Sequence, residues 1–250
     1  MKRPLTPDEI LLLRERFALA PAIERFSESV LPAASLCDPQ ACAEAMAATA
    51  ERAGYPNQKV TASTFVKRYA KHTAAAAFYA MSVMNLKLDW SADKCLADTA
   101  FVTAPRTACA GLTDWTGEAM PDLFDEAARH EAIDALVHDL FAGHLTPMVA
   151  ALKAATKVNA QILWENVAEA VYPIYDRVPE DVSLEGLVRL KTDYAYLLNG
   201  IAPEVFGLDF NPLKKFDLHD EAGRRTRKTC CLRYQVSRYC RNCPLRHKAH

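Results

Sequence analysis

The residues best suited to chemistry are four cysteines close together near the C-terminus. Cys230 and Cys231 are adjacent, eight residues follow, and Cys240 and Cys243 then form a Cys-x-x-Cys pair that is followed directly by Pro244. The two-residue spacer of such a pair forms a tight turn, so both sulfurs can face one metal atom while backbone N–H groups donate to the thiolates. The spacing therefore predicts a metal or cluster site.

Three interpretations of this segment remain open from the residues alone. An iron–sulfur cluster is favoured over structural zinc, and both are favoured over disulfides or unliganded cysteines. Adjacent cysteines leave an extended chain on opposite sides, so they serve one site only if the backbone bends between them. That arrangement is awkward for a small tetrahedral zinc site, which normally takes two Cys-x2–4-Cys pairs. A cluster with two irons accommodates it more easily.

The same segment carries a concentrated positive charge. From Arg224 to the end the chain has nine of its 30 Lys and Arg residues and none of its 31 Asp and Glu residues, although the formal net charge of the whole chain is only -1. Nearby cations stabilise thiolates and raise the reduction potential of a cluster. A charge separation of this size also predicts an anionic ligand or partner close to the cysteines.

The elements that must position this segment are predicted to be mostly helical. Alanine is abundant and only eight glycines occur, which favours helices over an all-β fold. Apolar residues recur at steps of three and four, between proline, glycine and capping signals, as in amphipathic helices. The predicted helices span residues 6–19, 39–53, 61–83, 133–141, 146–152, 162–172 and 183–198.

One region departs from the helical pattern. Leu86, Leu88 and Trp90 alternate with polar residues, and two short apolar runs flank Pro105, which predicts a small β-ribbon near residues 86–113. The predicted fold class is mainly α with a small β-ribbon (α+β). A predominantly helical body over residues 1–215 is followed by a basic cluster-binding segment over residues 216–250.

Composition narrows the class of protein. Half of the residues are hydrophobic and 24% are charged, as in ordinary globular domains. No run approaches the roughly 18 uninterrupted apolar residues of a membrane span, so no integral membrane segment is expected. A cytoplasmic protein is predicted, and in that compartment cysteines are more often metal ligands or core residues than disulfides.

The cysteine motif resembles the end of the FhuF-like ferric-siderophore reductases. The resemblance is most specific over residues 227–234 (RKTCCLRY) and 239–245 (YCRNCPL). A weaker match is LWENVA at residues 163–168, which is similar to LWGNVA in the family, and a third is the helix around residues 69–88. Two departures stand out. The cysteine spacer is eight residues rather than about ten, and Glu165 takes the place of a glycine.

The resemblance implies a [2Fe–2S] cluster on Cys230, Cys231, Cys240 and Cys243. It also implies reduction of iron(III) held by a hydroxamate-type siderophore in the cytoplasm. Iron(II) binds the hard oxygens of a siderophore far more weakly than iron(III), so one electron releases the metal. No Gly-x-Gly pair exists in the chain, so a dinucleotide fingerprint is absent. The electron donor is therefore expected to be external, such as a ferredoxin or a flavoprotein reductase.

Candidate substrate contacts are basic residues in two places. One group lies on a single predicted helix without an acidic residue among them, and the other directly precedes the cysteines. Either group could face an anionic siderophore, although a solvated surface is the default interpretation of such charges. The residues are Lys67, Arg68, Lys71, Arg224, Arg225 and Arg227.

Two other functions compete with iron reduction. A siderophore-binding or siderophore-biosynthesis protein without redox chemistry would use the four cysteines as a structural zinc site. A nucleic-acid-binding module would interleave exposed aromatic residues with the basic ones. The segment offers only Tyr234 and Tyr239 for that purpose, and its cysteine spacing fits no familiar zinc finger. A nucleic-acid partner is therefore not expected.

Overall fold

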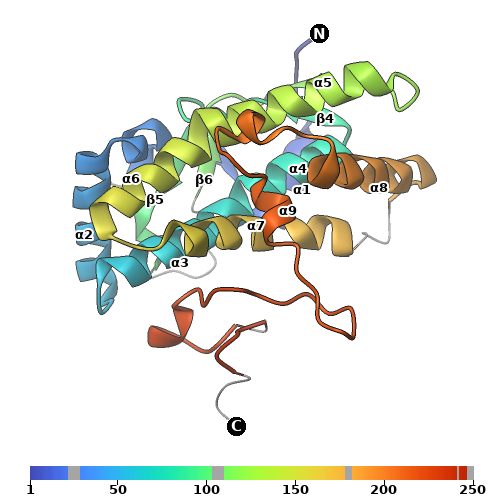
Figure 1. The fold of residues 1–250 in the computed structure, drawn as a ribbon. Coiled ribbons are helices and arrows are strands. Elements are labelled where there is room, and N and C mark those ends of the chain that lie inside the picture. Colours follow the sequence, from blue (N-terminus) through green and yellow to red (C-terminus); the bar gives the residue numbers. More distant parts are fainter. Residues whose placement is uncertain (22–28, 103–109, 178–181, 241, 247–250) are drawn as a thin grey trace.

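The computed structural model describes residues 1–21, 29–102, 110–177, 182–240 and 242–246 of the 250-residue chain. Helices dominate the described part, and short strands make up the remainder of its regular structure (Figure 1). The predicted fold class, mainly α with a small β component, is confirmed. The helices are α1 (Pro7–Phe17), α2 (Pro39–Ala53), α3 (Gln58–His72), α4 (Ala74–Ser82), α5 (Glu126–Val137), α6 (Thr146–Thr156), α7 (Ala160–Asp176), α8 (Leu184–Asn199) and α9 (Pro212–Lys215).

Local sequence signals explain where most of these helices begin. A side-chain oxygen just before the helix accepts a hydrogen bond from a backbone N–H that has no partner within the helix. At the start of α1 the arrangement is a full capping box, in which the Glu9 carboxylate in turn accepts a hydrogen bond from the backbone N–H of Thr6. The other side-chain N-caps are Asp38, Asn57, Asp125, Asn159, Ser183 and Asn211.

The long helix predicted from residue 61 is interrupted. It begins three residues earlier, at Gln58, and breaks at Thr73 into α3 and α4. The Thr73 hydroxyl donates to the carbonyl of Tyr69 at 2.9 Å, and such back-bonding from threonine bends helices. The bend turns α4 into the core, where every residue from Ala74 to Ser82 is buried.

The two helices predicted on either side of residue 146 are continuous instead. A π-helical segment, η4 (His138–Leu145), joins α5 to α6, so that the chain is helical from Glu126 to Thr156. In a π turn each N–H reaches the carbonyl five residues back, and this change of pitch lets Pro147, which has no N–H, follow without a break. By length and composition this helix could cross a membrane. However, 56% of its most apolar stretch is buried inside the protein, as in a core helix of a soluble protein.

The strands form two small sheets rather than one ribbon. One sheet has the order β1-β7-β4, and the other has the order β2-β6-β5-β3 with β2 parallel to β6. The predicted ribbon near residues 86–113 is thus divided between the sheets, and its residues 103–109 lie outside the described part. Alternation of apolar and polar residues indicates where strands lie but not which strands they pair with. Here three of the partner strands, β1, β2 and β3, come from the N-terminal part of the chain. The strands are β1 (Arg3–Pro4), β2 (Ala20–Pro21), β3 (Val30–Pro32), β4 (Leu86–Leu88), β5 (Cys95–Asp98), β6 (Ala110–Leu112) and β7 (Thr116–Ala119).

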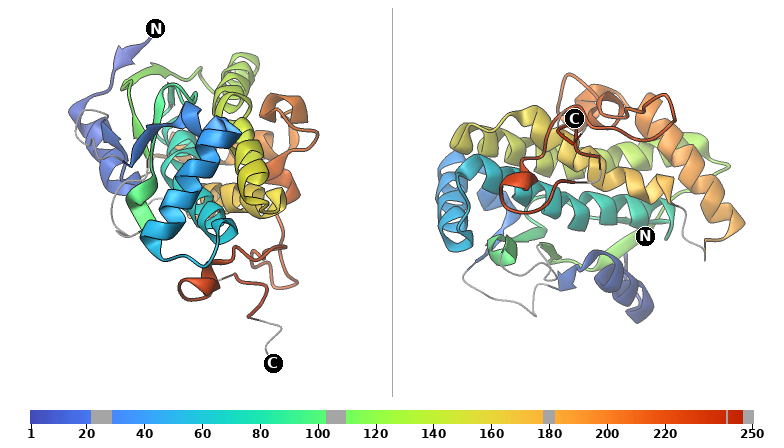
Figure 2. Two further views of the ribbon diagram at one scale, coloured as in Figure 1. Left: turned by 90° about the vertical axis from the view of Figure 1, so that its left-hand side faces the viewer. Right: turned by 90° about the horizontal axis from the view of Figure 1, so that it is seen from below.

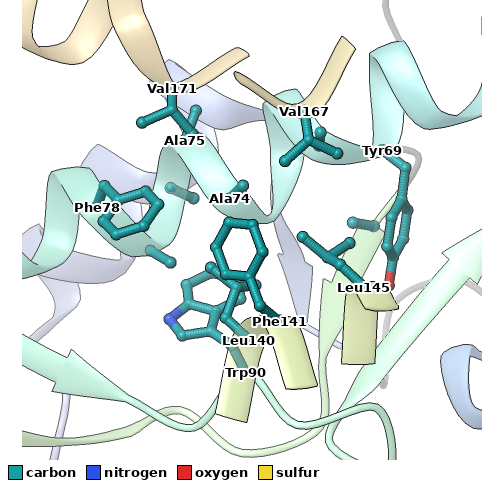
Figure 3. Packing of buried hydrophobic residues seen from close by; sticks show 14 of the residues in the cluster. Tyr69, Ala74, Ala75, Phe78, Trp90, Leu140, Phe141, Leu145, Val167 and Val171 are labelled. Atoms are coloured by element: carbon teal, nitrogen blue, oxygen red, sulfur yellow. The ribbon is translucent and has the colours of Figure 1, made fainter. Parts of the chain in front are cut away.

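The core lies where α4, the long helix and α7 meet. Small residues such as Ala74 and Ala75 let α4 approach its neighbours closely, and the large rings of Phe78, Trp90 and Phe141 fill the space beside it (Figure 3). All five side chains are at most 2% exposed. This apolar core is built from residues that precede the cysteines in the chain, so it forms a platform on which the cysteines are placed.

The C-terminal segment runs along one side of this platform. After α9 the described chain has little regular structure, apart from a bridge between His219 and Arg225 and the 3-10 helix η6 (Arg233–Gln235). It passes below α7 and α3 in Figure 1, and η6 packs against α3. The views in Figure 2 agree that the segment lies outside the helical layers. The division into a body and a segment at residue 216 remains a prediction.

Candidate functional site

The four cysteines of the C-terminal segment come together in two pairs. The sulfurs of Cys231 and Cys240 are 2.8 Å apart, which exceeds a disulfide bond length of about 2.05 Å. The Cys243 thiol is a hydrogen-bonding neighbour of Cys230. All four are free thiols, with Cys231 and Cys243 buried and the other two partly exposed. Each residue of the adjacent pair therefore meets one residue of the Cys-x-x-Cys pair.

The bend that adjacent cysteines require follows them directly. Leu232 has a φ of 60°, in the left-handed region that non-glycine residues rarely adopt. The turn directs the N–H of Leu232 to the sulfur of Cys230 at 3.4 Å. The eight-residue spacer then folds through η6 and is closed by the stacked rings of Tyr234 and Tyr239, whose centroids are 5.4 Å apart. This compact turn returns the chain to Cys240.

Positive charge and hydrogen bonds act on the buried sulfur. The Cys240 thiol donates to Cys231, and together with the cations of Lys67 and Arg227 this lowers the pKa of Cys231 to about 5. The Lys67 ammonium on α3 is 3.4 Å from that sulfur. Donating to Cys231 raises the pKa of Cys240, and burial raises the pKa of Cys230. These contacts favour the thiolate form of Cys231 over that of the other three cysteines.

The donor set fits a two-iron cluster in number and chemistry. Each iron of such a cluster takes two cysteine sulfurs, and the thiols here stand two by two. Within the described residues no group of three or more His, Cys, Asp or Glu side chains converges as a metal site. Sulfurs on one tetrahedral metal are about 3.7 Å apart for bonds of about 2.3 Å. The Cys231–Cys240 pair would therefore open by about 1 Å to hold a metal atom.

A buried carboxylate on α7 fastens the chain just ahead of the cysteines. Glu165 is 1% exposed. It accepts hydrogen bonds from the backbone N–H of Lys228 at 2.6 Å and from the N–H of Thr229 at 2.8 Å, and also from the Thr229 hydroxyl. The guanidinium of Arg227, also buried, is 3.4 Å from the same carboxylate and donates to Asn166 at 2.8 Å. The charge of Glu165 is therefore both paired and hydrogen-bonded, as burial requires.

The polar network continues to the cysteines themselves. The Asn166 amide donates to the carbonyl and the hydroxyl of Ser63 on α3, both at 3.0 Å. The Ser63 hydroxyl donates in turn to the carbonyl of Cys231 at 2.8 Å. Helices α3 and α7 thus hold the backbone on both sides of Cys230, which fixes the adjacent cysteines against the body.

The sequence patterns do not reveal this network. Glu165 stands out in the sequence only as a departure from a glycine, and Ser63 carries no signal at all. A usable signal exists in α7, where Glu165 and Asn166 interrupt a run of apolar residues between Trp164 and Val167. Polar residues on a buried helix face need partners, and here the backbone partner of Glu165 at Lys228 follows 63 residues later.

Beside the cysteines, the C-terminal segment, α7 and Lys67 of α3 line an open cavity of about 1330 Å³. Cys240 lies on its wall. The predicted contacts Lys67, Arg224, Arg225 and Arg227 line it as well, whereas Arg68 and Lys71 are not among the lining residues. The structure therefore brings four of the six predicted basic residues to one cavity.

Three of these four residues already hold the segment together. Arg225 lies over the ring of Tyr172 at 3.7 Å and pairs with Asp176 and Asp217. Arg224 pairs with Asp220 at 2.8 Å, and Arg227 is bound in the Glu165 network. The fourth residue, Lys67, lies beside the sulfur of Cys231 instead. The prediction that these residues contact substrate remains a prediction.

The fold and this site define a mainly helical protein with a basic, thiol-rich C-terminal segment fastened to two core helices. The family model described as ferric iron reductase FhuF-like transporter matches residues 63–237, well over half of the chain. The chain belongs to this FhuF-like family. The match includes Lys67, Glu165, Cys230 and Cys231 and ends before Cys240.

Other comparisons bear on the fold alone. The structure of the aerobactin synthetase IucC from a hypervirulent pathotype of Klebsiella pneumoniae is similar with a TM-score of 0.50 and 13% sequence identity. The likeness covers 77% of this chain and 37% of the synthetase, so the chain spans little more than a third of that protein's length. No curated protein matches the chain.

Proposed function

We propose that the protein is a cytoplasmic ferric-siderophore reductase that uses a [2Fe–2S] cluster on Cys230, Cys231, Cys240 and Cys243. The observation that carries the proposal is the pairing of these thiols beside a basic cavity whose wall includes Cys240. Membership of the FhuF-like family, which is linked to iron reduction, supports it. If a cluster is bound, Cys231 with Cys240 and Cys230 with Cys243 would be the two pairs of ligands that hold it.

The reaction is a one-electron reduction of the substrate iron. When bound, the cluster supplies single electrons, which it receives from an external ferredoxin or flavoprotein reductase. Siderophore-held iron(III) becomes iron(II), whose lower charge density weakens its bonds to the siderophore oxygens. No bond in the siderophore itself needs to break, so the free siderophore is the second product.

The chain's own residues have three tasks in this proposal. Lys67 and the N–H of Leu232 stabilise negative charge on the sulfurs, which favours the thiolate form. The burial of Cys231 and Cys243 keeps water from half of the ligands. The cavity holds the ferric siderophore next to Cys240, which shortens the path of the electron.

The decisive test is anaerobic electron paramagnetic resonance of the dithionite-reduced protein, with iron and sulfide analysis. We expect a rhombic S = 1/2 signal that is lost or altered in Cys243→Ser. Cys37→Ser, which changes a cysteine of the helical body, is the matched control and should leave the signal unchanged. The reduced protein should then transfer its electrons to a ferric siderophore, which is followed by bleaching or recovery of the visible absorbance.

Two outcomes would contradict the proposal. A silent spectrum with stoichiometric zinc after anaerobic purification would indicate a structural four-cysteine zinc site, and hence a siderophore-binding or siderophore-biosynthesis protein without redox chemistry. A cluster that stays reduced in the presence of every ferric siderophore offered would retain the cofactor but exclude the activity.

A further inference from the structure

The charge of the cavity beside Cys240 is strongly unbalanced. Its wall contains eight cationic side chains against three carboxylates. At about 1330 Å³ it is larger than the roughly 300–1,000 Å³ pockets that hold drug-sized ligands. The cations are Lys67, Arg177, Arg224, Arg225, Arg227, Arg233, Arg238 and Arg246, and the carboxylates are Glu169, Asp176 and Asp220.

Two of the three carboxylates are already paired with neighbouring cations. Asp176 pairs with Arg225 and Asp220 with Arg224, both at 2.9 Å or less. Glu169 lies 4.0 Å from Arg227, and its Oε1 atom has no hydrogen-bond partner among the described residues. The remaining five cations have no carboxylate partner within the described part of the chain. They are Lys67, Arg177, Arg233, Arg238 and Arg246.

A buried donor on the wall is also without a partner. Arg227 is 5% exposed as a residue, and its Nη1 atom has no hydrogen-bond partner among the described residues. The carboxylate of Glu169 is too far away at 4.0 Å. The rest of the guanidinium is fixed by Glu165, Asn166 and the carbonyl of Thr229. A buried donor of this kind favours a ligand that brings an acceptor oxygen.

From these observations we infer that the cavity prefers ferric chelates with a net negative charge on peripheral carboxylates over neutral chelates of similar size. Guanidinium groups bind carboxylates through two parallel hydrogen bonds. Lys67 already faces the Cys231 sulfur, and the other four cations without a carboxylate partner attract an anion from solution. A chelate whose hydroxamates just cancel the ferric charge is neutral and gains no attraction from these cations. A citrate-based chelate with additional carboxylates is negatively charged and is attracted by them. The inference rests on the proposed function for the identity of the metal complex.

Gallium(III) complexes test this preference without electron transfer, because gallium(III) has the charge and geometry of iron(III) but is not reduced. Binding to the full-length protein is measured by titration calorimetry with two probes: the gallium complex of a citrate-based dihydroxamate and the neutral gallium complex of a cyclic trihydroxamate. We expect the anionic probe to bind at least about tenfold more tightly at low salt, with the advantage shrinking as salt screens the cations.

Variants of exposed cavity residues locate the effect. Arg238→Gln combined with Arg246→Gln should weaken binding of the anionic probe about tenfold and leave the neutral probe almost unchanged. Lys59→Gln combined with Lys153→Gln removes the same charge from exposed positions of α3 and α6 that are not on the wall. This control should have a much smaller effect, since distant exposed charges are screened.

The inference is overturned if both probes bind equally, or if the control pair of variants weakens the anionic probe as much as the cavity pair. These outcomes are independent of the redox proposal. A protein that reduces neutral and anionic ferric chelates with equal affinity would keep the function and lose the preference. A protein that binds anionic gallium chelates but carries no cluster would keep the preference and lose the function.

Discussion

The helical body and the C-terminal segment are held by different forces. In the body, apolar side chains such as Phe78, Leu140 and Phe141 are fully buried around the alanines of α4. In the segment, the side chains buried beyond Phe216 are, within the described residues, those of Arg227, Cys231 and Cys243. The body is therefore stabilised mainly by burial of apolar surface, whereas the segment depends on a few hydrogen bonds and on whatever its thiols bind.

This difference shows how the chain can combine a rigid platform with a reactive site. Apolar packing is dense and insensitive to redox state, so the body keeps α3 and α7 in place. The segment attaches to these helices through Glu165, Asn166 and Ser63. A metal atom held between Cys231 and Cys240 would open this pair by about 1 Å, and the attachment lies between these thiols and the core. Changes at the thiols are thereby separated from the packing of the body.

The largest effect on global stability is expected from a cavity in the body. Phe141→Ala removes a ring that contacts those of Phe78, Trp164 and Phe206. It should lower the free energy of unfolding by about 3–5 kcal/mol, measured by urea denaturation followed by circular dichroism. The thiol pairs should keep their reactivity under native conditions. A loss below about 1 kcal/mol would contradict the view that this core carries the fold.

A smaller and local effect is expected at the attachment of the segment. Glu165→Gln removes the charge that faces Arg227 and weakens the acceptor of the Lys228 and Thr229 amides. We expect the attachment to weaken by about 1.5–3 kcal/mol, measured by faster hydrogen exchange of these two amides. Global unfolding should change little, because the segment can open while the body stays folded.

The matched control for this variant is Glu185→Gln. Glu185 pairs with Arg189 at 2.6 Å, but its side chain is 71% exposed, and exposed ion pairs contribute little. Exchange of the Lys228 and Thr229 amides should be unchanged in the control. Equal exchange in both variants would show that Glu165 does not hold the segment.

The smallest expected effect is a dependence of the stability of the helical body on pH. Burial lowers the pKa of His144 and of His72 to about 4. His144 is neutral: its Nδ1–H donates to the carbonyl of Trp90 at 2.7 Å, and its Nε2 accepts from the Tyr69 hydroxyl at 3.0 Å. The folded pKa lies below the unfolded value of about 6.5. The unfolded chain therefore takes up protons first as pH falls, and stability is lost between about pH 6.5 and pH 4.

As pH falls from about 7 to about 5.5, we expect the free energy of unfolding to decrease by about 1 kcal/mol for each histidine. Urea denaturation at each pH measures this slope of stability against pH. His144→Gln should reduce this slope whatever its effect on stability at neutral pH. Glu165→Gln should leave the slope unchanged, because the histidines belong to the body. An unaltered slope in His144→Gln would show that the pKa of this residue is the same in the folded and the unfolded chain.

The helices could be predicted from the sequence because their signals are local. Thr6 with Glu9, Asp38 before Pro39, and Ser183 each mark a helix start through contacts within one turn. The strands were harder to place, since β7 pairs with β1 and β4 only across long separations in the chain. The helix continues through Pro147 because a π-helical segment precedes it. Helix propensities of the residues do not indicate such a segment.

Spacing and composition are local properties, and they are enough to specify the mainly helical class, the candidate ligands Cys230, Cys231, Cys240 and Cys243, and the basic charge around them. The partners of these residues became apparent only in the folded chain, where Cys231 meets Cys240 and the segment contacts Lys67 on α3 and Glu165 on α7. The contacts to α3 and α7 join residues far apart in the chain, and they require that the apolar core hold the two helices side by side.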